Sequence, residues 1–276
     1  MAATGETPIA LTIAGSDSSG GAGIQADLKT FTVFGVYGAS VITALTAQNT
    51  RGVSAIHAVP APFVTRQIDA VATDLKVRAV KTGMLNDADV VRAVADGVRR
   101  HNLHPLVVDP VMVATSGDVL LRSDAVEAVR TELLPLADLI TPNLPEAAHL
   151  LACPLADGEA EMEAQARALL ALGPAAVLLK GGHGEGAEAV DVLVQRDRAP
   201  LRLAMARIDT PNTHGTGCTL SAAIATRLAL GDSLEAAVRE AKRFVHAALL
   251  AGVKQKIGNG AGPLDHLHGL RKGHGH

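Results

Sequence analysis

The chain has 276 residues, of which 48% are hydrophobic and 19% charged, and this balance excludes a disordered or fibrous protein. A formal net charge of −3 gives no indication of a nucleic-acid partner. Only 2% of the residues are aromatic, so Ala, Val, Leu and Ile must supply the core.

In the first third of the chain, apolar runs alternate with helical patterns. An apolar strand is predicted at residues 9–14, a glycine-rich loop at 15–23 and a helix at 24–34. The loop lacks the dinucleotide-binding Gly-x-Gly-x-x-Gly spacing, and it is equally compatible with a backbone that closes over a small ligand. Further strands are predicted at 37–46 and 53–59, with a helix at 61–75.

The same alternation continues to the end of the chain. Strands are predicted at 77–81, 105–108, 139–141 and 175–180, and a hairpin at 190–195 and 200–206. Helices are predicted at 87–101, 123–134 with Ser123 as N-cap, from 142–146 onward, and at 159–172, 219–230 and 233–250. The pattern indicates an α/β fold with a mainly parallel sheet and helices on both faces. No linker or repeat divides the chain, so we expect one domain over residues 1–276.

Cysteine content and the N-terminal residues favour a cytoplasmic protein. Cys153 and Cys218 are too few for a disulfide framework. No apolar run approaches the ~20 residues that cross a bilayer, and residues 1–7 lack the regions of a signal peptide. We therefore expect no membrane partner. Residues 1–7 and 271–276 are expected to be flexible, a frayed end being favoured over a metal site for the His-containing ending.

Polar side chains follow the predicted strands. The set is Asp17, Gln48 with Asn49, Thr82, Asp109, Asn143 and Lys180. Because the carboxyl ends of parallel strands share one edge of the sheet, where ligands bind in open α/β folds, these residues are expected to form a site.

A second glycine motif, residues 209–218 (Asp-Thr-Pro-Asn-Thr-His-Gly-Thr-Gly-Cys), ends at the predicted helix 219–230. Its glycines let backbone amides approach an anion, and the helix dipole adds positive charge there. The same position is expected to favour the thiolate of Cys218. An anion cradle with a reactive group suggests phosphoryl transfer. A glycine-softened turn with a core thiol is the alternative.

With these motifs in hand, the sequence resembles the hydroxymethylpyrimidine/phosphomethylpyrimidine kinases of thiamine biosynthesis, within the ribokinase-like superfamily. The likeness runs from Ile9 to about Leu270 and implies a three-layer ribokinase-like sandwich. The segments that carry it are 11–17, 20–31, 43–50, 109–112, 141–146, 180–183 and 212–220. Ser18 stands where the family usually has proline, which would mainly stiffen the loop.

The resemblance implies phosphorylation of 4-amino-5-hydroxymethyl-2-methylpyrimidine and then of its monophosphate with MgATP. Cys218, where many ribokinase-like enzymes have Asp, is implied as the base, with a pKa lowered toward neutral by the helix N-terminus. The amides of Gly215, Thr216, Gly217 and Cys218 are implied as the anion hole. Substituting Gly215 or Gly217 is expected to lower kcat more than stability. Cys153, outside any motif, is interpreted as structural.

The metal and nucleotide side follows from the same resemblance. Asn143 and Glu146 match the Asn-x-x-Glu element tied to Mg²⁺ and its waters; the alternative is an ordinary capping box, and both can hold. Lys180 and Thr213 are implied as contacts of the ATP phosphates, and Asp109 as a residue that helps hold the metal–phosphate group. For Lys180 the alternative is a solvated lysine.

Gln48 is the strongest candidate for the pyrimidine, because an amide matches the amino group and adjacent ring nitrogen. Gly15, Ala22, Asp27 and Met84 line the same pocket by family position. The alternatives are a surface position for Asp27 and a core role for Met84.

Two other functions compete with the pyrimidine kinase. The nearest is a pyridoxal kinase, which Gln48 and the Gly-Thr-Gly-Cys motif disfavour. The other is a non-catalytic pyrimidine sensor, which would not need Cys218 as a base. A homodimer is implied by the resemblance alone.

Overall fold

The computed structural model describes residues 6–112, 123–182 and 186–271. Within these ranges nine strands form one sheet in the order β3-β2-β1-β4-β5-β6-β7-β8-β9. The strands are β1 Ile9–Asp17, β2 Tyr37–Asn49, β3 Gly52–Ala58, β4 Val77–Thr82, β5 Leu106–Val108, β6 Leu139–Ile140, β7 Ala176–Lys180, β8 Glu188–Gln195 and β9 Leu201–Ala206. Neighbouring strands from β2 to β7 are parallel, while the β2–β3, β7–β8 and β8–β9 pairs are antiparallel. The predicted mainly parallel sheet and terminal hairpin are confirmed.

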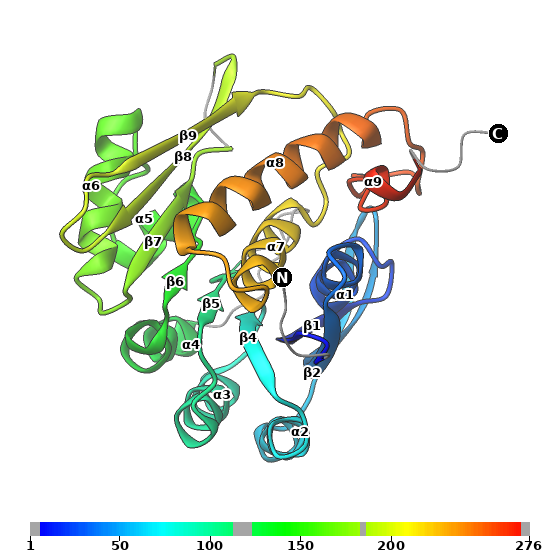
Figure 1. Ribbon diagram of the computed structural model, residues 1–276, viewed down its shortest axis with the longest axis vertical. Helices are drawn as coiled ribbons and strands as arrows, with labels where there is room; N and C mark the ends of the chain where they lie inside the picture. Colours follow the sequence, from blue (N-terminus) through cyan, green and yellow to red (C-terminus); the bar gives the residue numbers. More distant parts are fainter. Residues whose placement is uncertain (1–5, 113–122, 183–185, 272–276) are drawn as a thin grey trace.

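Helices cover both faces of this sheet (Figure 1). They are α1 Gly23–Val33, α2 Ala61–Ala72, α3 Ala88–His101, α4 Ser123–Ala128, α5 Leu144–Leu151, α6 Glu159–Leu170, α7 Thr216–Ala229, α8 Leu234–Gly252 and α9 His268–Arg271. One apolar core lies between the sheet and α2 to α6, and a second between the sheet and α1, α7 and α8. As the composition predicts, Ala, Val, Leu and Ile dominate both cores.

Local sequence accounts for these boundaries. The Asp87 side chain caps α3 by accepting a hydrogen bond from the Val90 amide at 2.9 Å, and three basic residues in the last turn complement the helix dipole. β5, in the middle of the sheet, is buried at every residue, which its Leu-Val-Val sequence allows because helices cover both faces.

Several predicted boundaries differ from the structure. β1 continues through Asp17, with a bulge between Ala14 and Ser16, so the glycine loop is shorter than predicted. The helix predicted at 123–134 is α4 followed by a π-helical turn at Val129–Leu133 and a 3₁₀ turn at Leu134–Leu136, because Pro135 lacks the N–H that an α-helix requires. Ser123 is the first residue of α4 and not its N-cap.

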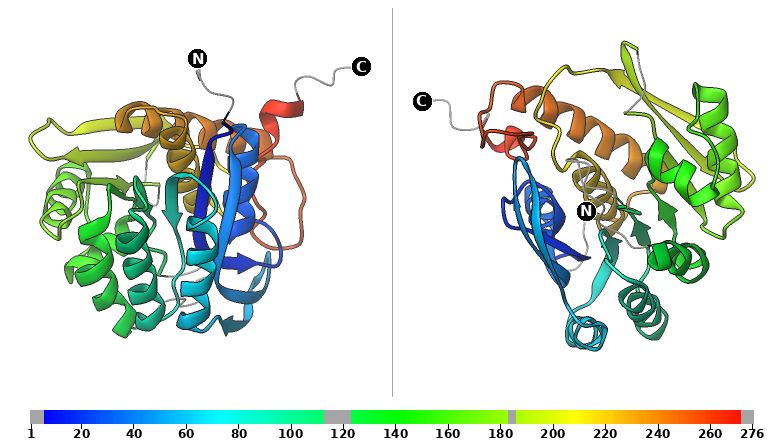
Figure 2. Two further views of the ribbon diagram at one scale, coloured as in Figure 1. Left: turned by 60° about the horizontal axis from the view of Figure 1, so that its bottom comes forward. Right: turned by 180° about the vertical axis from the view of Figure 1, so that it is seen from behind.

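Both ends of the chain add contacts that were not predicted. Glu6 pairs with Lys76 at 2.7 Å, while residues 1–5 and 272–276, predicted to be flexible, lie outside the described residues. The segment that ends in α9 returns to the side of α1 (Figure 2).

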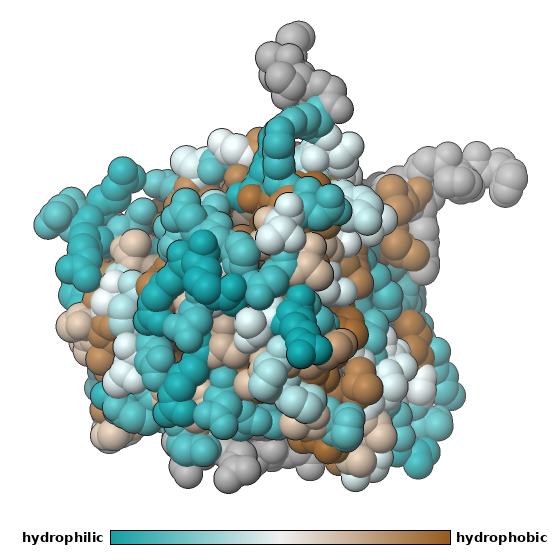
Figure 3. Space-filling view, turned by 90° about the horizontal axis from the view of Figure 1, so that it is seen from below, coloured by the Kyte–Doolittle hydropathy of each residue, from teal (hydrophilic) through white to brown (hydrophobic). Residues whose placement is uncertain are grey.

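Of the helices in the described ranges, none is both long enough and apolar enough to cross a bilayer. The face shown in Figure 3 is mostly hydrophilic, and its hydrophobic areas are small and separate.

Candidate functional site

The two glycine loops meet where α1 and α7 begin. Gly215, the N-cap of α7, has a φ of 79° and approaches Gly21 so closely that a Cβ would collide with the Gly21 carbonyl oxygen. A Cβ at Gly23 would collide in the same way with the carbonyl oxygen of Gly15. Glycine is therefore required at both contacts. For Gly215, a substitution is therefore expected to cost stability as well as kcat, and which of the two losses is larger stays a prediction.

Cys218 is the third residue of α7, which begins at Thr216, three residues earlier than predicted. The side chain is partly exposed, and its sulfur accepts a hydrogen bond from the amide of Gly23 at the start of α1. Burial nevertheless raises the pKa of the thiol to about 11 and outweighs both this amide and the nearby Lys81 cation. The predicted lowering of the Cys218 pKa is therefore wrong. Its role as the base stays a prediction.

A fully buried ion pair lies beneath the thiol. The Lys81 Nζ donates to both carboxylate oxygens of Asp27 at 2.8 Å, and the Thr12 hydroxyl donates to one of them at 2.6 Å. Burial would lower the pKa of Lys81, but Asp27 and the neighbouring acidic groups raise it, so the lysine stays charged. Asp27 is thus no surface residue, and a direct contact with a bound ring stays a prediction.

Lys180, at the end of β7, lies in a cluster of polar side chains. Its Nζ lies 3.0 Å from Asp109 Oδ1, which also accepts from the Thr141 hydroxyl at 2.9 Å. Ser221 on α7 donates to the other Asp109 oxygen at 3.2 Å. A Cβ at Gly217 would lie 3.2 Å from the Lys180 Nζ, so the glycine motif faces the lysine directly. Lys180 is therefore paired and partly buried, not freely solvated.

Asn143 and Glu146 form the capping box that the sequence allowed. The Glu146 carboxylate accepts a hydrogen bond from the backbone N–H of Asn143 at 2.7 Å. The Asn143 side-chain oxygen accepts one from the backbone N–H of Glu146 at 2.9 Å. Burial, with Asp109 nearby, raises the pKa of Glu146 to about 7 although Lys180 acts to lower it. A divalent cation would favour the ionised carboxylate and so fits these two acidic groups. The described residues contain no cluster of three or more His, Cys, Asp or Glu placed to hold a metal.

The predicted pyrimidine residues lie in or just after β1, β2 and β4 and at the start of α1. A Cβ at Gly15 would lie 3.2 Å from the Met84 sulfur, so these two are neighbours. The Gln48 side-chain amide lies 3.1 Å from the Thr46 hydroxyl, which donates its proton to the Ser16 carbonyl oxygen at 2.8 Å. A cavity of about 310 Å³ opens beside Gln48; it is lined by Gln48, Asn49, Thr50, Arg51, Gly52, His214, Gly260 and Ala261. Thr213 is exposed just before His214.

Two residues of the site had no role assigned from the sequence. The Asp17 carboxylate accepts a hydrogen bond from His214 at 2.9 Å, and the backbone amide of Ala22, a predicted substrate residue, also donates to it, at 2.8 Å. Burial would raise the pKa of Asp17, but these hydrogen bonds and those from Ser19 lower it strongly. A partner 197 residues away cannot be read from the sequence, although Asp17 lies in the set at the strand ends and His214 lies inside the glycine motif.

His266, in the C-terminal segment, is a buried residue that contacts Thr219 of α7. It is 5% exposed, its Nε2 lies 2.9 Å from the Thr219 hydroxyl, and burial lowers its pKa to about 4.

As pH falls below 6.5, an unfolded chain takes up a proton at His266 before the folded chain does. This group is therefore expected to remove about 3 kcal/mol of stability between pH 6.5 and 4. His266→Gln should flatten the free energy of unfolding over this range, measured by urea titration. The exposed His57→Gln is the control, and an unchanged slope in His266→Gln would contradict the prediction.

Comparison with known proteins identifies the family. A profile of the phosphomethylpyrimidine kinase family matches residues 17–265. The chain belongs to this family. It is 58% identical over 262 residues to the hydroxymethylpyrimidine/phosphomethylpyrimidine kinase of Rhizobium meliloti (strain 1021), covering 95% of this chain and 98% of that relative.

Solved structures agree with the family. The phosphomethylpyrimidine kinase of Clostridium difficile 630 is 44% identical with a TM-score of 0.76, covering 86% of this chain and 97% of that one. Bacillus subtilis pyridoxal kinase, in an ADP complex, is 37% identical with a TM-score of 0.88, covering 96% and 99%. The predicted ribokinase-like three-layer fold is confirmed.

Proposed function

We propose that this chain is a kinase that phosphorylates 4-amino-5-hydroxymethyl-2-methylpyrimidine and then its monophosphate, with ATP as donor, in thiamine biosynthesis. Membership of the phosphomethylpyrimidine kinase family supports the reaction class. The observation that carries the proposal is the close approach of Gly217, next to Cys218, to Lys180 and Asp109 at the carboxyl edge of the sheet.

In the alcohol step, the hydroxymethyl oxygen attacks the γ-phosphorus of ATP, the bond from this phosphorus to the β,γ-bridging oxygen breaks to release ADP, and the attacking oxygen must lose its proton. Cys218 accepts this proton as a thiolate. The amides of Gly215, Thr216, Gly217 and Cys218 stabilise the transferring phosphoryl group, and Lys180 adds a positive charge against the phosphates. Phosphoryl transfer depends mainly on position and charge, which these groups supply.

Mg²⁺ fits the carboxylates of Asp109 and Glu146, with Asn143 fixing Glu146 through the capping box. When bound there, the ion would neutralise charge on the ATP phosphates. Because Lys180 is already paired with Asp109, the lysine is held in place before nucleotide binds. Thr213, exposed at the start of the motif, is proposed as an outer contact of the phosphates.

On the acceptor side, Gln48 binds the aminopyrimidine edge through its side-chain amide, and Gly15, Ala22 and Met84 form the apolar wall. Asp27 supports this wall from the core through its buried ion pair with Lys81. We also propose a cytoplasmic homodimer in which residues 1–276 form one catalytic domain.

A substrate panel tests this proposal. Phosphoryl transfer from MgATP is measured to the pyrimidine alcohol, its monophosphate and pyridoxal. We expect the highest kcat/KM with the two pyrimidines. A strong preference for pyridoxal would show that the proposed acceptor is wrong. No turnover with any acceptor in the presence of Mg²⁺ would support a non-catalytic pyrimidine sensor.

A further inference from the structure

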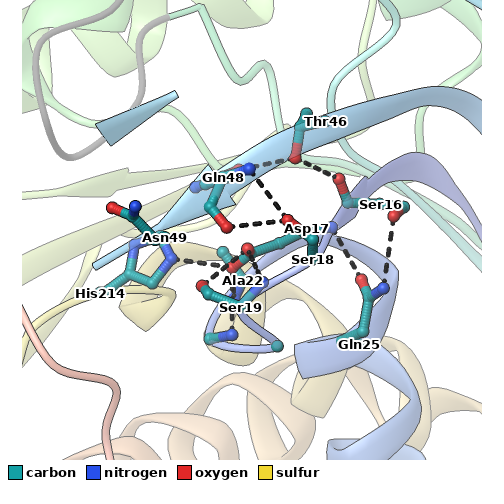
Figure 4. Close-up of polar contacts among 12 residues, drawn as sticks. Ser16, Asp17, Ser18, Ser19, Ala22, Gln25, Thr46, Gln48, Asn49 and His214 are labelled. Carbon is teal, nitrogen blue, oxygen red and sulfur yellow. Dashed lines mark hydrogen bonds and ion pairs between the residues drawn. The ribbon is translucent and has the colours of Figure 1, made fainter. Parts of the chain in front are cut away.

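Ser18 binds the backbone of Gln48 from the neighbouring glycine loop (Figure 4). Its hydroxyl donates to the Gln48 carbonyl oxygen at 2.7 Å and accepts from the Gln48 amide at 2.9 Å. The pairing of β1 with β2 ends at Asp17 and Thr46, so the Gln48 backbone lies beyond the last residue of β1, where Ser18 takes the place of a strand partner. Ser18 therefore fixes the residue that we propose to bind the pyrimidine. A residue without a hydroxyl could not make these two bonds.

Asp17, the residue just before Ser18, accepts five hydrogen bonds on its carboxylate. Its Oδ1 accepts from the Ser19 amide and hydroxyl at 2.8 and 2.7 Å. Its Oδ2 accepts from the amides of Gly21 and Ala22 at 3.0 and 2.8 Å and from the His214 Nε2 at 2.9 Å. The side chain is 2% exposed, and the loss of these donors would leave a buried charge unpaired.

His214 connects this carboxylate to the anion hole. It directly precedes Gly215, its side chain is 8% exposed, and its backbone amide donates to the Gly262 carbonyl at 3.0 Å. A Cβ at Gly21 would collide with the His214 ring, so the two loops are in direct contact. Figure 4 shows the resulting sequence of contacts from Gln48 through Ser18 and Asp17 to His214.

We infer that Ser18, Asp17 and His214 are positioning residues that set the distance between the pyrimidine at Gln48 and the phosphoryl group at the anion hole. This inference rests on the proposed function. None of the three needs to contact the reacting atoms. A displacement of about 1 Å between reacting groups can cost about 10²-fold in rate. Contacts that hold the pyrimidine site and the anion hole at a fixed distance therefore affect kcat more than the binding of either substrate.

The first test compares two variants of His214. His214→Leu removes the N–H that reaches Asp17, whereas His214→Gln keeps an N–H at a similar reach. We expect His214→Leu to lower kcat for transfer to the pyrimidine about 100-fold, with KM for each substrate within about 3-fold of wild type. Hydrolysis of ATP without pyrimidine should fall much less than transfer, because water needs no alignment with Gln48. His214→Gln should recover most of kcat.

His101→Leu is the matched control, because it removes another His–Asp pair, 2.7 Å long, between α3 and α2. Its kinetics should match wild type. Equal loss of transfer and ATP hydrolysis in His214→Leu, or no recovery in His214→Gln, would contradict the positioning role.

Ser18→Ala tests the contact with the Gln48 backbone and leaves the hydrogen bonds of the buried Asp17 carboxylate in place. Ser18 is exposed, so this variant is expected to fold, and kcat for transfer to the pyrimidine should fall about 10-fold while KM for ATP is unchanged. Wild-type kinetics in Ser18→Ala would overturn the inference and leave the proposed function intact. No transfer to any pyrimidine by the unmodified chain would overturn both.

Discussion

Cys218→Ala is expected to leave the chain folded and to lower kcat for the pyrimidine alcohol by about 10²- to 10³-fold. The thiol is small and partly exposed, so its removal leaves little unfilled space in the core. The loss in rate follows from the alcohol, which must give up its proton as it attacks phosphorus. Steady-state kinetics and thermal unfolding of the variant measure the two effects separately.

The pH profile connects this loss to the structure. Burial raises the pKa of Cys218 to about 11, so the thiolate fraction of the free enzyme rises with pH through the neutral range. We therefore expect kcat/KM for the alcohol to increase about tenfold per pH unit from pH 7 to 9 in wild type, and to be nearly flat in Cys218→Ala. Cys153→Ala is the matched control, since Cys153 bonds only near its own loop and helix α6.

The monophosphate offers a second control within one enzyme. A phosphate monoester has a second pKa of about 6, so its attacking oxygen is already ionised at neutral pH and needs no base. Cys218→Ala should thus retain much more of the second phosphorylation than of the first. Equal losses in both steps would show that Cys218 serves binding or packing, and near-wild-type activity in both would remove the base assignment altogether.

Much of the fold could be predicted because strand and helix periods in this chain are clear. Buried runs such as Leu106–Val108 and the capped helix Ala88–His101 are set by local sequence, and parallel topology then brings the strand ends to one edge. That is why Asp109 and Lys180, 71 residues apart, could be expected together before their contact was seen.

Other features depend on partners that are distant in the chain. Helix capping and the dipole predict a low pKa for Cys218, but the desolvation that reverses it comes from α1 and β4 packing around the thiol. The positive φ and close contact that require glycine at position 215 exist only once Gly21 lies beside it. Likewise, Ser18 could be judged a minor departure from the family, since its bonds to Gln48 depend on the register of β2.

Gly217→Ala is expected to lower kcat about 10²-fold with little change in Tm. The added Cβ would lie 3.2 Å from the Lys180 Nζ and 3.8 Å from Asp109 Oδ2, so the flexible tip of the lysine must move away from the phosphates. Losing one such electrostatic contact typically costs ~10²-fold in kcat. Alanine is also the better helix former, by about 1 kcal/mol, which offsets the crowding.

Gly215→Ala is the contrasting variant two residues earlier. Its φ of 79° and the collision with the Gly21 carbonyl require the backbone itself to shift, so we expect a loss of about 1–3 kcal/mol in unfolding free energy together with activity. Thermal unfolding and kcat measured on both variants separate the two glycines. If Gly217→Ala kept its kcat, the lysine would not act on the transferring phosphoryl group, and if Gly215→Ala kept its Tm, the contact between the loops would not require glycine.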